Sequence, residues 1–173
     1  MDIWGEPSVA AEAELIASVF ALVDRLGLAH GAVRIGVSSR ALLEETLRAG
    51  VLATRPDAFA PLCVIIDKLS KIGADAVTQL LADPAGAVGL SAAEARDVVA
   101  LLGVTSLDDA AAAATADSRA IADLRRLFEL LDAYGVADYV DFDASVVRGL
   151  AYYTGVVFEA YDAGKKLRAL AGN

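Results

Sequence analysis

The segment that decides the fold runs from residue 148 to residue 159 and reads RGLAYYTGVVFE. Arg148 offers a fixed fork of hydrogen-bond donors that suits a phosphate or a carboxylate. Tyr152 and Tyr153 can line a flat apolar slot and still offer hydroxyl groups, and Gly149 and Gly155 let the backbone approach a ligand closely. An ordinary edge strand with an exposed arginine and two packing tyrosines explains the same residues, and residue types alone favour that second interpretation.

The residues on both sides of this segment favour β-strands. Residues 156–161 are mostly β-branched or aromatic, and residues 139–142 have the same character. A hairpin turn is expected at residues 162–165, with a returning strand at residues 167–171. Apolar and small or polar residues alternate over residues 33–37, which predicts a further strand near the N-terminus.

The first fifty residues also contain two helical patterns. Ser8 is expected to cap a first helix whose apolar residues recur at helical spacing as far as Leu26. Ser38 or Ser39 is expected to cap a second helix over roughly residues 40–49. The beginning of the chain therefore mixes helix and strand.

The middle of the chain, residues 56–137, shows helical patterns and no strand. The short apolar run at residues 64–66 is ambiguous by itself, and we interpret it as helix because its neighbours keep helical spacing. Ser91 and Glu94 have the spacing of a capping box. Residues 120–134 form a strongly amphipathic helical pattern. Strand character on both sides of a helical middle predicts an α+β fold interrupted by an all-helical insertion.

The composition excludes several classes of protein. The chain has 173 residues, a formal charge of −9, one cysteine and one histidine. Cys63 has no intrachain disulfide partner, which favours a reducing compartment, and one histidine with one cysteine is too few for a zinc site, so no metal site is predicted. The longest apolar runs, such as residues 62–66, fall far short of the ~18 residues of a membrane span.

Two further exclusions concern secretion and nucleic acids. The first seven residues have neither a basic region nor a long apolar region, so no signal peptide is expected there and the protein is not expected to be secreted. The acidic balance argues against non-specific nucleic-acid binding by bulk charge, although it leaves room for a local basic patch.

Residues 148–159 closely resemble the histidine-specific signature of the histidyl-tRNA synthetases, which runs Arg-Gly-Leu-x-Tyr-Tyr-Thr-Gly and then Val-Phe-Glu. Ala151 stands where the family often has aspartate, and members resembling plant organellar forms also carry alanine there. A twelve-residue match is specific, unlike a lone glycine pattern.

Other segments resemble the same family in the same order along the chain. Residues 1–5 are similar to the stretch after motif 2 of the class II synthetases, and residues 11–16 to the helix that follows it. Residues 37–43 resemble the next strand-to-helix step. Residues 66–72 resemble the Asp-Lys-x-x-Lys segment that opens the family's helical insertion, and the resemblance is weakest over residues 74–118.

The resemblance implies a partial class II synthetase core, in which an antiparallel sheet is interrupted by the helical insertion. The expected domains are a first part of the core at residues 1–55, the insertion at residues 56–137, and a second part of the core with the signature at residues 138–173. Motifs 1, 2 and 3 and the anticodon-binding domain of the family have no counterpart in the chain, so it resembles a central segment of a longer protein that is poorly active alone.

The family's residue roles carry over where the residues match. Arg148 would contact the α-phosphate of ATP and the carboxylate of histidine, and Tyr152 and Tyr153 would line the histidine pocket. Asp2 falls where the family has an acidic residue that accepts from the imidazole N–H, although a frayed terminus explains it equally.

Four basic residues fall in the expected insertion, which in the family approaches the acceptor stem of the tRNA. A tRNA contact and a solvated helix face are equally good interpretations of these residues, which are Lys68, Lys71, Arg125 and Arg126.

The leading hypothesis is a histidine–tRNA ligase fragment that uses ATP, accompanied by Mg²⁺ in the complete enzyme, to activate histidine and transfer it to tRNA. The complete family protein is a homodimer of the cytoplasm or of an organelle matrix, chloroplast or mitochondrion. A second hypothesis is a non-catalytic histidine-binding subunit similar to the regulatory subunit of ATP phosphoribosyltransferase. A third is a truncated product that folds only as the insertion, with residues 1–55 and 138–173 loose.

Overall fold

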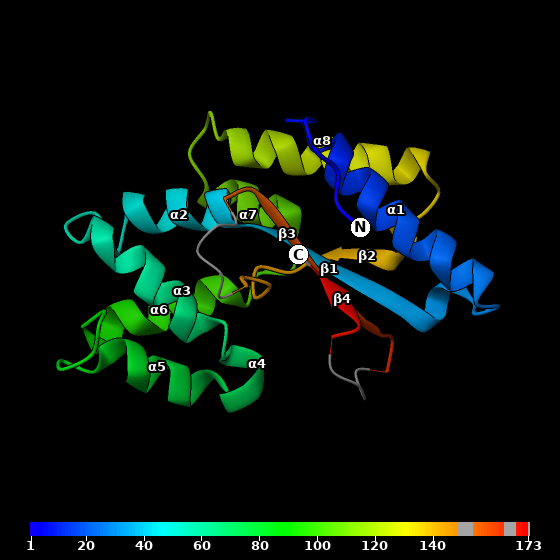
Figure 1. The fold of residues 1–173 in the computed structure, drawn as a ribbon. Helices are drawn as coiled ribbons and strands as arrows, with labels where there is room; N and C mark the ends of the chain where they lie inside the picture. The colour runs from blue at the N-terminus through cyan, green and yellow to red at the C-terminus, as the bar shows by residue number, and fades with distance from the viewer. Residues whose placement is uncertain (149–153, 165–168, 173) are drawn as a thin grey trace.

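The sheet organises the molecule. The computed structural model describes residues 1–148, 154–164 and 169–172. Across these residues four strands form one sheet in the order β2-β1-β3-β4, with helices above it and to one side (Figure 1). The strands are β1 (Val33–Ser39), β2 (Val140–Phe142), β3 (Val156–Asp162) and β4 (Ala171–Gly172). One sheet with segregated helices confirms the predicted α+β class.

The pairing of the strands differs in one respect from the antiparallel sheet that the sequence predicts. β3 runs antiparallel to both β1 and β4. β2, however, pairs parallel with β1, so that Ile35 lies opposite Val140 and Val37 lies opposite Phe142. The helical connection between these two strands is long enough to return the chain to the same end of the sheet, which a parallel pair requires.

The stretch between β1 and β2 contains helices joined by loops and no strand, as predicted for residues 56–137, and the ambiguous run at residues 64–66 lies in a helix. The helices of the described residues are α1 (Ala10–Arg25), α2 (Arg40–Ala49), α3 (Phe59–Ile66), α4 (Leu69–Ile72), α5 (Ala74–Ala82), α6 (Ala92–Leu102), α7 (Leu107–Ala113) and α8 (Arg119–Ala133). Short 3-10 helices occupy His30–Ala32, Pro56–Ala58 and Ala137–Tyr139.

Helix starts follow the predicted capping residues with one exception. Ser39 caps α2, and Ser91 with Glu94 forms the predicted capping box of α6. Ser8 was expected to cap α1, but the N-cap is Val9 and no side chain caps it. The Ser8 hydroxyl instead accepts a 3.3 Å hydrogen bond from the amide two residues along the chain, a local bond that serine favours in turns.

The first hydrophobic core lies between the sheet and the helices α1 and α8, which run side by side along one face of it (Figure 1). Alternate apolar residues of β1 and β3 meet the apolar stripes of both helices there. Its most buried large members are Ile16, Phe20, Ile35, Val37, Leu124, Leu127 and Leu131.

The second core is built by helices to one side of the sheet, mainly α2, α3, α5 and α6. Its most buried large members are Leu52, Leu62, Ile66, Leu81 and Leu102. Packing therefore divides the chain differently from the expected insertion of residues 56–137, because α7 and α8 pack with the sheet. In the structure α1 and the strands share a core with α8, and the hypothesis that only the helical part folds stays a prediction.

The opposite face of the sheet is polar and open only in part: Val157 on it is fully buried, whereas Arg34, Glu159 and Tyr161 are partly exposed. Successive side chains of a strand point to opposite faces, and Ile35 points into the first core. Arg34 and Gly36 of β1 therefore face away from α1 and α8, as do Glu159 and Tyr161 of β3, which lie opposite them in the register. This open polar face carries the candidate site.

Candidate active site

Arg148 lies at the open polar face, where its side chain meets a strand carboxylate. Arg148 Nη1 donates to Glu159 Oε1 at 2.8 Å. The side chains are 30% and 35% exposed, so the pair is partly shielded and still reachable by a ligand. The predicted signature thus brings its first and last residues together across one ion pair.

Gly36 creates room for the chain that leads to Arg148. A Cβ atom at Gly36 would lie 3.1 Å from Val146 Cγ2 and 3.6 Å from Asp143 Cβ, so only glycine leaves this approach unhindered. Asp143 Oδ1 accepts from the amide and the hydroxyl of Ser145 at 2.9 and 2.5 Å, which is an Asx turn. This turn lays the chain against the sheet just before Arg148.

The backbone of Arg148 adopts a conformation that residues other than glycine rarely take. Its φ is +55°, the one positive φ of a non-glycine residue in the described part of the chain. Such a conformation costs about 1–3 kcal/mol and persists only where surrounding contacts hold it, most often at functional sites. The strained residue here is the arginine that the signature singles out.

A second arginine–carboxylate pair lies on the same face. Arg34 binds Asp141 through both Nε, at 3.0 Å, and Nη2, and donates to the Asp138 carbonyl at 2.7 Å. Burial raises the pKa of Tyr161, and the carboxylates of Asp141 and Asp143 raise it further. Tyr161 is therefore a neutral hydroxyl at physiological pH, able to donate or accept a hydrogen bond.

A cleft opens on the helical side of the sheet, next to the end of the signature. Its volume is ≈ 340 Å³, and Thr154 and Gly155 form part of its wall. Glu12 and Asp123 line it from α1 and α8. Burial raises the pKa of Glu12, and the charges of Asp123 and Glu6 raise it further. Glu45 and Arg119 line it as well, so the cleft wall carries three carboxylates and one guanidinium, a balance that does not favour a phosphate.

The other predicted histidine contacts are placed only in part. Tyr152 and Tyr153 lie outside the described residues. Asp2 is exposed in the N-terminal segment that precedes α1 and has no regular secondary structure. Of the predicted histidine contacts, the structure therefore places Arg148 at the candidate site. That Asp2, Tyr152 and Tyr153 join Arg148 in one histidine pocket stays a prediction.

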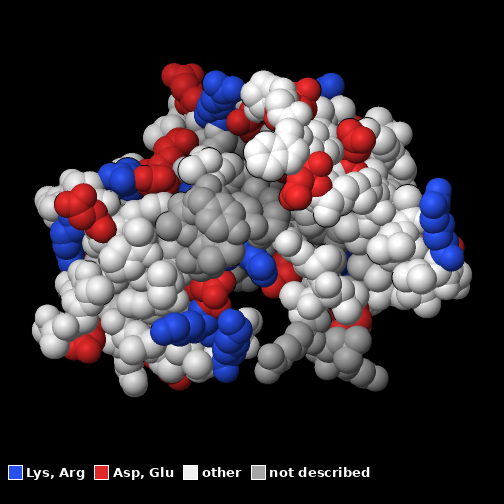
Figure 2. All heavy atoms as spheres, viewed as in Figure 1, with Lys and Arg blue, Asp and Glu red and all other residues white. Residues whose placement is uncertain are grey.

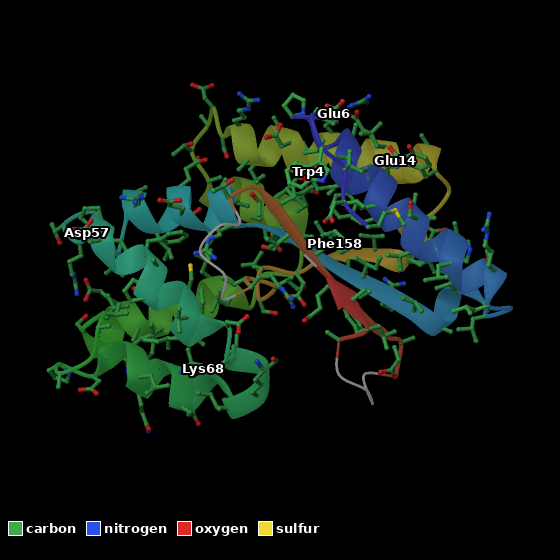
Figure 3. The ribbon with its side chains drawn as sticks, in the orientation of Figure 1. Trp4, Glu6, Glu14, Asp57, Lys68 and Phe158 are labelled. Carbon is green, nitrogen blue, oxygen red and sulfur yellow. The ribbon has the colours of Figure 1, made fainter. Side chains whose placement is uncertain are left out.

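The four predicted tRNA contacts do not form one surface. Lys68 and Lys71 are exposed at α4, and Arg125 and Arg126 are exposed on α8, at opposite edges of the molecule (Figures 1 and 3). Figure 2 shows basic and acidic side chains interspersed over the visible face.

Two of these four residues also have acidic neighbours. Lys71 Nζ lies 3.9 Å from Asp67 Oδ2, and Arg126 Nη1 lies 2.8 Å from Glu129 Oε2. Lys71 and Arg126 are therefore already paired with carboxylates of their own segments.

Sequence reasoning missed the residue that holds the backbone of Arg148. Arg40 begins α2 and is only 5% exposed, and its Nη1 donates to the Arg148 carbonyl at 3.0 Å. A cation is disfavoured at a helix N-terminus by the helix dipole. An arginine directly after the Ser39 cap was therefore a signal that it binds something outside the helix.

The described residues contain neither a candidate metal site nor a candidate membrane span. No group of three or more His, Cys, Asp or Glu side chains in this part of the chain could hold a metal ion. Within the same ranges, no helix has the length and hydrophobicity that crossing a membrane requires.

The chain is similar in sequence to proteins of one family. The sequence model of the family described as histidyl-tRNA synthetase matches residues 1–172. A histidine–tRNA ligase of chloroplasts and mitochondria from Arabidopsis thaliana is 44% identical over 172 residues, which are 99% of this chain and 34% of that protein. A histidine–tRNA ligase from Thermoplasma volcanium is 33% identical, over 99% of this chain and 38% of its own length. The chain thus spans about a third of these relatives.

Solved structures share the fold. A Bacillus halodurans protein described as an ATP phosphoribosyltransferase regulatory subunit/histidyl-tRNA synthetase superposes with a TM-score of 0.75 at 23% identity, covering 97% of this chain and 43% of that one. The histidyl-tRNA synthetase from Nostoc sp. PCC 7120 gives a TM-score of 0.73 at 20% identity, covering 92% and 38%.

Proposed function

Because the chain belongs to the histidyl-tRNA synthetase family, we propose that it forms the central part of the catalytic core of a histidine–tRNA ligase. The reaction would join histidine and ATP into histidyl-adenylate and pyrophosphate, and then transfer the histidyl group to tRNA. One observation supports this role beyond family membership. Arg148 is held at the open polar face by Glu159, as a phosphate-binding arginine would be.

Arg148 would act by positioning and by charge stabilisation. Its guanidinium has five N–H donors, so the bond from Nη1 to Glu159 leaves others to reach the α-phosphate of ATP and the histidine carboxylate. Negative charge on the α-phosphate builds up as the carboxylate attacks and pyrophosphate leaves, and a fixed cation stabilises that charge without reorganising. Glu159 keeps the guanidinium from swinging into solvent before the substrates arrive.

The remaining substrate contacts are assigned by the signature. Tyr152 and Tyr153 would line the histidine pocket, and Asp2 would accept from the imidazole N–H. Mg²⁺ would enter with ATP as part of that substrate, since it binds nucleotides chiefly through their phosphates.

The tRNA would meet two surfaces and not one. Lys68 with Lys71, and Arg125 with Arg126, are proposed as separate contacts because they lie at opposite edges of the molecule. We take the helical insertion to be the second core, about residues 52–102, since α8 packs with the sheet. A homodimer, and a site of action in the cytoplasm or in an organelle such as that of the Arabidopsis relative, belong to the same proposal.

Arg148→Ala tests the proposal in the protein that carries this chain. We expect histidine-dependent exchange of pyrophosphate into ATP to fall by about a hundredfold or more, because removal of one transition-state donor costs about that much. Arg48→Ala, which removes an exposed arginine also paired with a glutamate, should leave exchange unchanged. Near-normal exchange in Arg148→Ala, or exchange that does not require histidine, would overturn the assignment.

A second candidate function is a histidine-binding regulatory subunit, because the description of the Bacillus halodurans structure names an ATP phosphoribosyltransferase regulatory subunit beside histidyl-tRNA synthetase. The ligase charges tRNA and forms histidyl-adenylate, whereas the regulatory subunit does neither. Charging of tRNA with histidine supports the ligase. Histidine binding with neither pyrophosphate exchange nor tRNA charging supports the regulatory subunit.

A further inference from the structure

Arg40 occupies an unusual position for a charged residue. It is the first residue of α2, and 95% of its surface is buried, as its 5% exposure shows. Its guanidinium carbon lies 5.4 Å from the centre of the Phe59 ring, a cation–π contact with α3 of the second core. A buried cation at a helix N-terminus is opposed both by desolvation and by the helix dipole, so its contacts must compensate.

Two of those contacts hold the two ends of the segment 148–155, the part of the signature that precedes β3. The Arg40 backbone N–H donates to the Gly155 carbonyl at 2.9 Å, and its Nη1 donates to the Arg148 carbonyl at 3.0 Å. Arg148 opens the signature, and Gly155 is the last residue before β3. One residue, fixed by the first turn of a helix, thus fixes the separation of the two ends.

The bond to the Arg148 carbonyl also restrains a strained residue. The φ of +55° at Arg148 needs external contacts to persist. Glu159 holds the side chain of Arg148, and Arg40 holds its backbone at the adjacent peptide group. The orientation of the guanidinium depends on both, because the side chain can be aimed only as well as its backbone is fixed.

We propose that Arg40 is a positioning residue that holds both ends of the segment 148–155 and thereby aims Arg148 at the substrates. This inference rests on the proposed function for its catalytic consequence, although the structural hold itself does not. Arg40 touches no reacting atom in this account and acts through Arg148.

Arg40→Met is the informative variant. Methionine keeps the backbone N–H that binds Gly155 and much of the packing on Phe59, and it removes the donor to the Arg148 carbonyl. In pyrophosphate exchange we expect kcat to fall at least about tenfold while KM for ATP and for histidine changes less than about threefold, because the loss affects the transition state more than ground-state binding. Arg40→Lys, which retains one cationic donor, should recover part of the rate.

Arg55 provides a matched control in the second core. Its Nη1 donates to the Gly89 carbonyl at 2.8 Å and its Nη2 to Glu94 at 2.6 Å, so it also ties a backbone carbonyl and lies away from the signature. Arg55→Met should lower thermal stability and leave kcat unchanged. Equal losses of kcat in Arg40→Met and Arg55→Met would overturn the proposal, since the loss would then follow stability alone.

Trypsin cleavage tests the hold on the 173-residue chain without requiring activity. Trypsin cuts after arginine and must draw the Arg148 carbonyl into its own oxyanion hole, which competes with the Arg40 bond. We expect cleavage between Arg148 and Gly149 to be at least about fivefold faster in Arg40→Met, and unchanged in Arg55→Met, since cleavage of a locally opened site follows the population of the open form.

The two measurements separate the possible failures. Unchanged cleavage in Arg40→Met overturns the hold, whatever the activity. Cleavage can be faster in Arg40→Met while the wild-type protein shows no histidine-dependent pyrophosphate exchange. That combination supports the contact of Arg40 with the Arg148 carbonyl and overturns the proposed function. Faster cleavage together with an unchanged kcat overturns the claim that Arg40 aims Arg148.

Discussion

Leu124→Ala measures how strongly α8 is bound into the sheet domain. Leu124 is fully buried in the first core, between α8, α1 and the strands. Truncating a fully buried leucine costs about 2–5 kcal/mol, out of a total of about 5–15 kcal/mol for a domain. Since 1 kcal/mol shifts the melting midpoint of a protein of this size by about 2–4 °C, a loss of about 3 kcal/mol predicts a fall of about 9 °C.

The location of the damage matters as much as its size. Hydrogen exchange should accelerate at the β1 amides, such as those of Ile35 and Val37, whose side chains share the core with Leu124. Leu81→Ala, at an equally buried position of the second core, should accelerate exchange in α5 and α6. Leu22→Ala, on the exposed side of α1, should change stability by less than about 0.5 kcal/mol.

Undisturbed β1 amides in Leu124→Ala, with α5 and α6 disturbed, would refute this reasoning. That result would mean that α8 belongs to the helical insertion, as the sequence alone predicts. A melting midpoint of Leu124→Ala as high as that of Leu22→Ala would refute the packing of α8 in the first core.

Two further predictions concern titrating groups. Burial and the charges of Asp123 and Glu6 raise the pKa of Glu12 in the folded state, so its ionisation opposes folding, and this opposition is complete once the pH exceeds the folded pKa. Glu12→Gln should therefore raise the melting midpoint at pH 7 and leave it unchanged at a pH well below the pKa of glutamate. Burial also raises the pKa of the Cys63 thiol to about 11, so alkylation by iodoacetamide at pH 8 should be at least about a hundredfold slower in the native protein than in urea. Because that folded pKa lies above the unfolded one, stability should fall between about pH 9 and 11, and equal alkylation rates in both states would contradict the burial of Cys63.

Local patterns in the sequence were enough to predict most elements. The bounds of α2 agree with the expected residues 40–49, and the capping box of Ser91 and Glu94 is present as expected. The run at residues 64–66 is helical because spacing over the longer window outweighed its β-branched character. These features depend on neighbours in the sequence, which is why they could be predicted.

Features that depend on distant residues could not be predicted in the same way. The apolar stripe of α8 showed that the helix would be buried, but not that it would cover the sheet. The parallel pairing of β1 with β2 depends on where a long connection brings the chain back. The burial of Arg40 depends on Phe59 and the Arg148 carbonyl, which only the fold brings to it.

A crystal structure of the protein with histidine and a non-hydrolysable ATP analogue tests the central claim most directly. The account predicts that the α-phosphate lies on the open polar face, within hydrogen-bond distance of the Arg148 guanidinium, which keeps its contact with Glu159. Phosphates bound elsewhere, with Arg148 out of hydrogen-bond reach of both substrates, would contradict it.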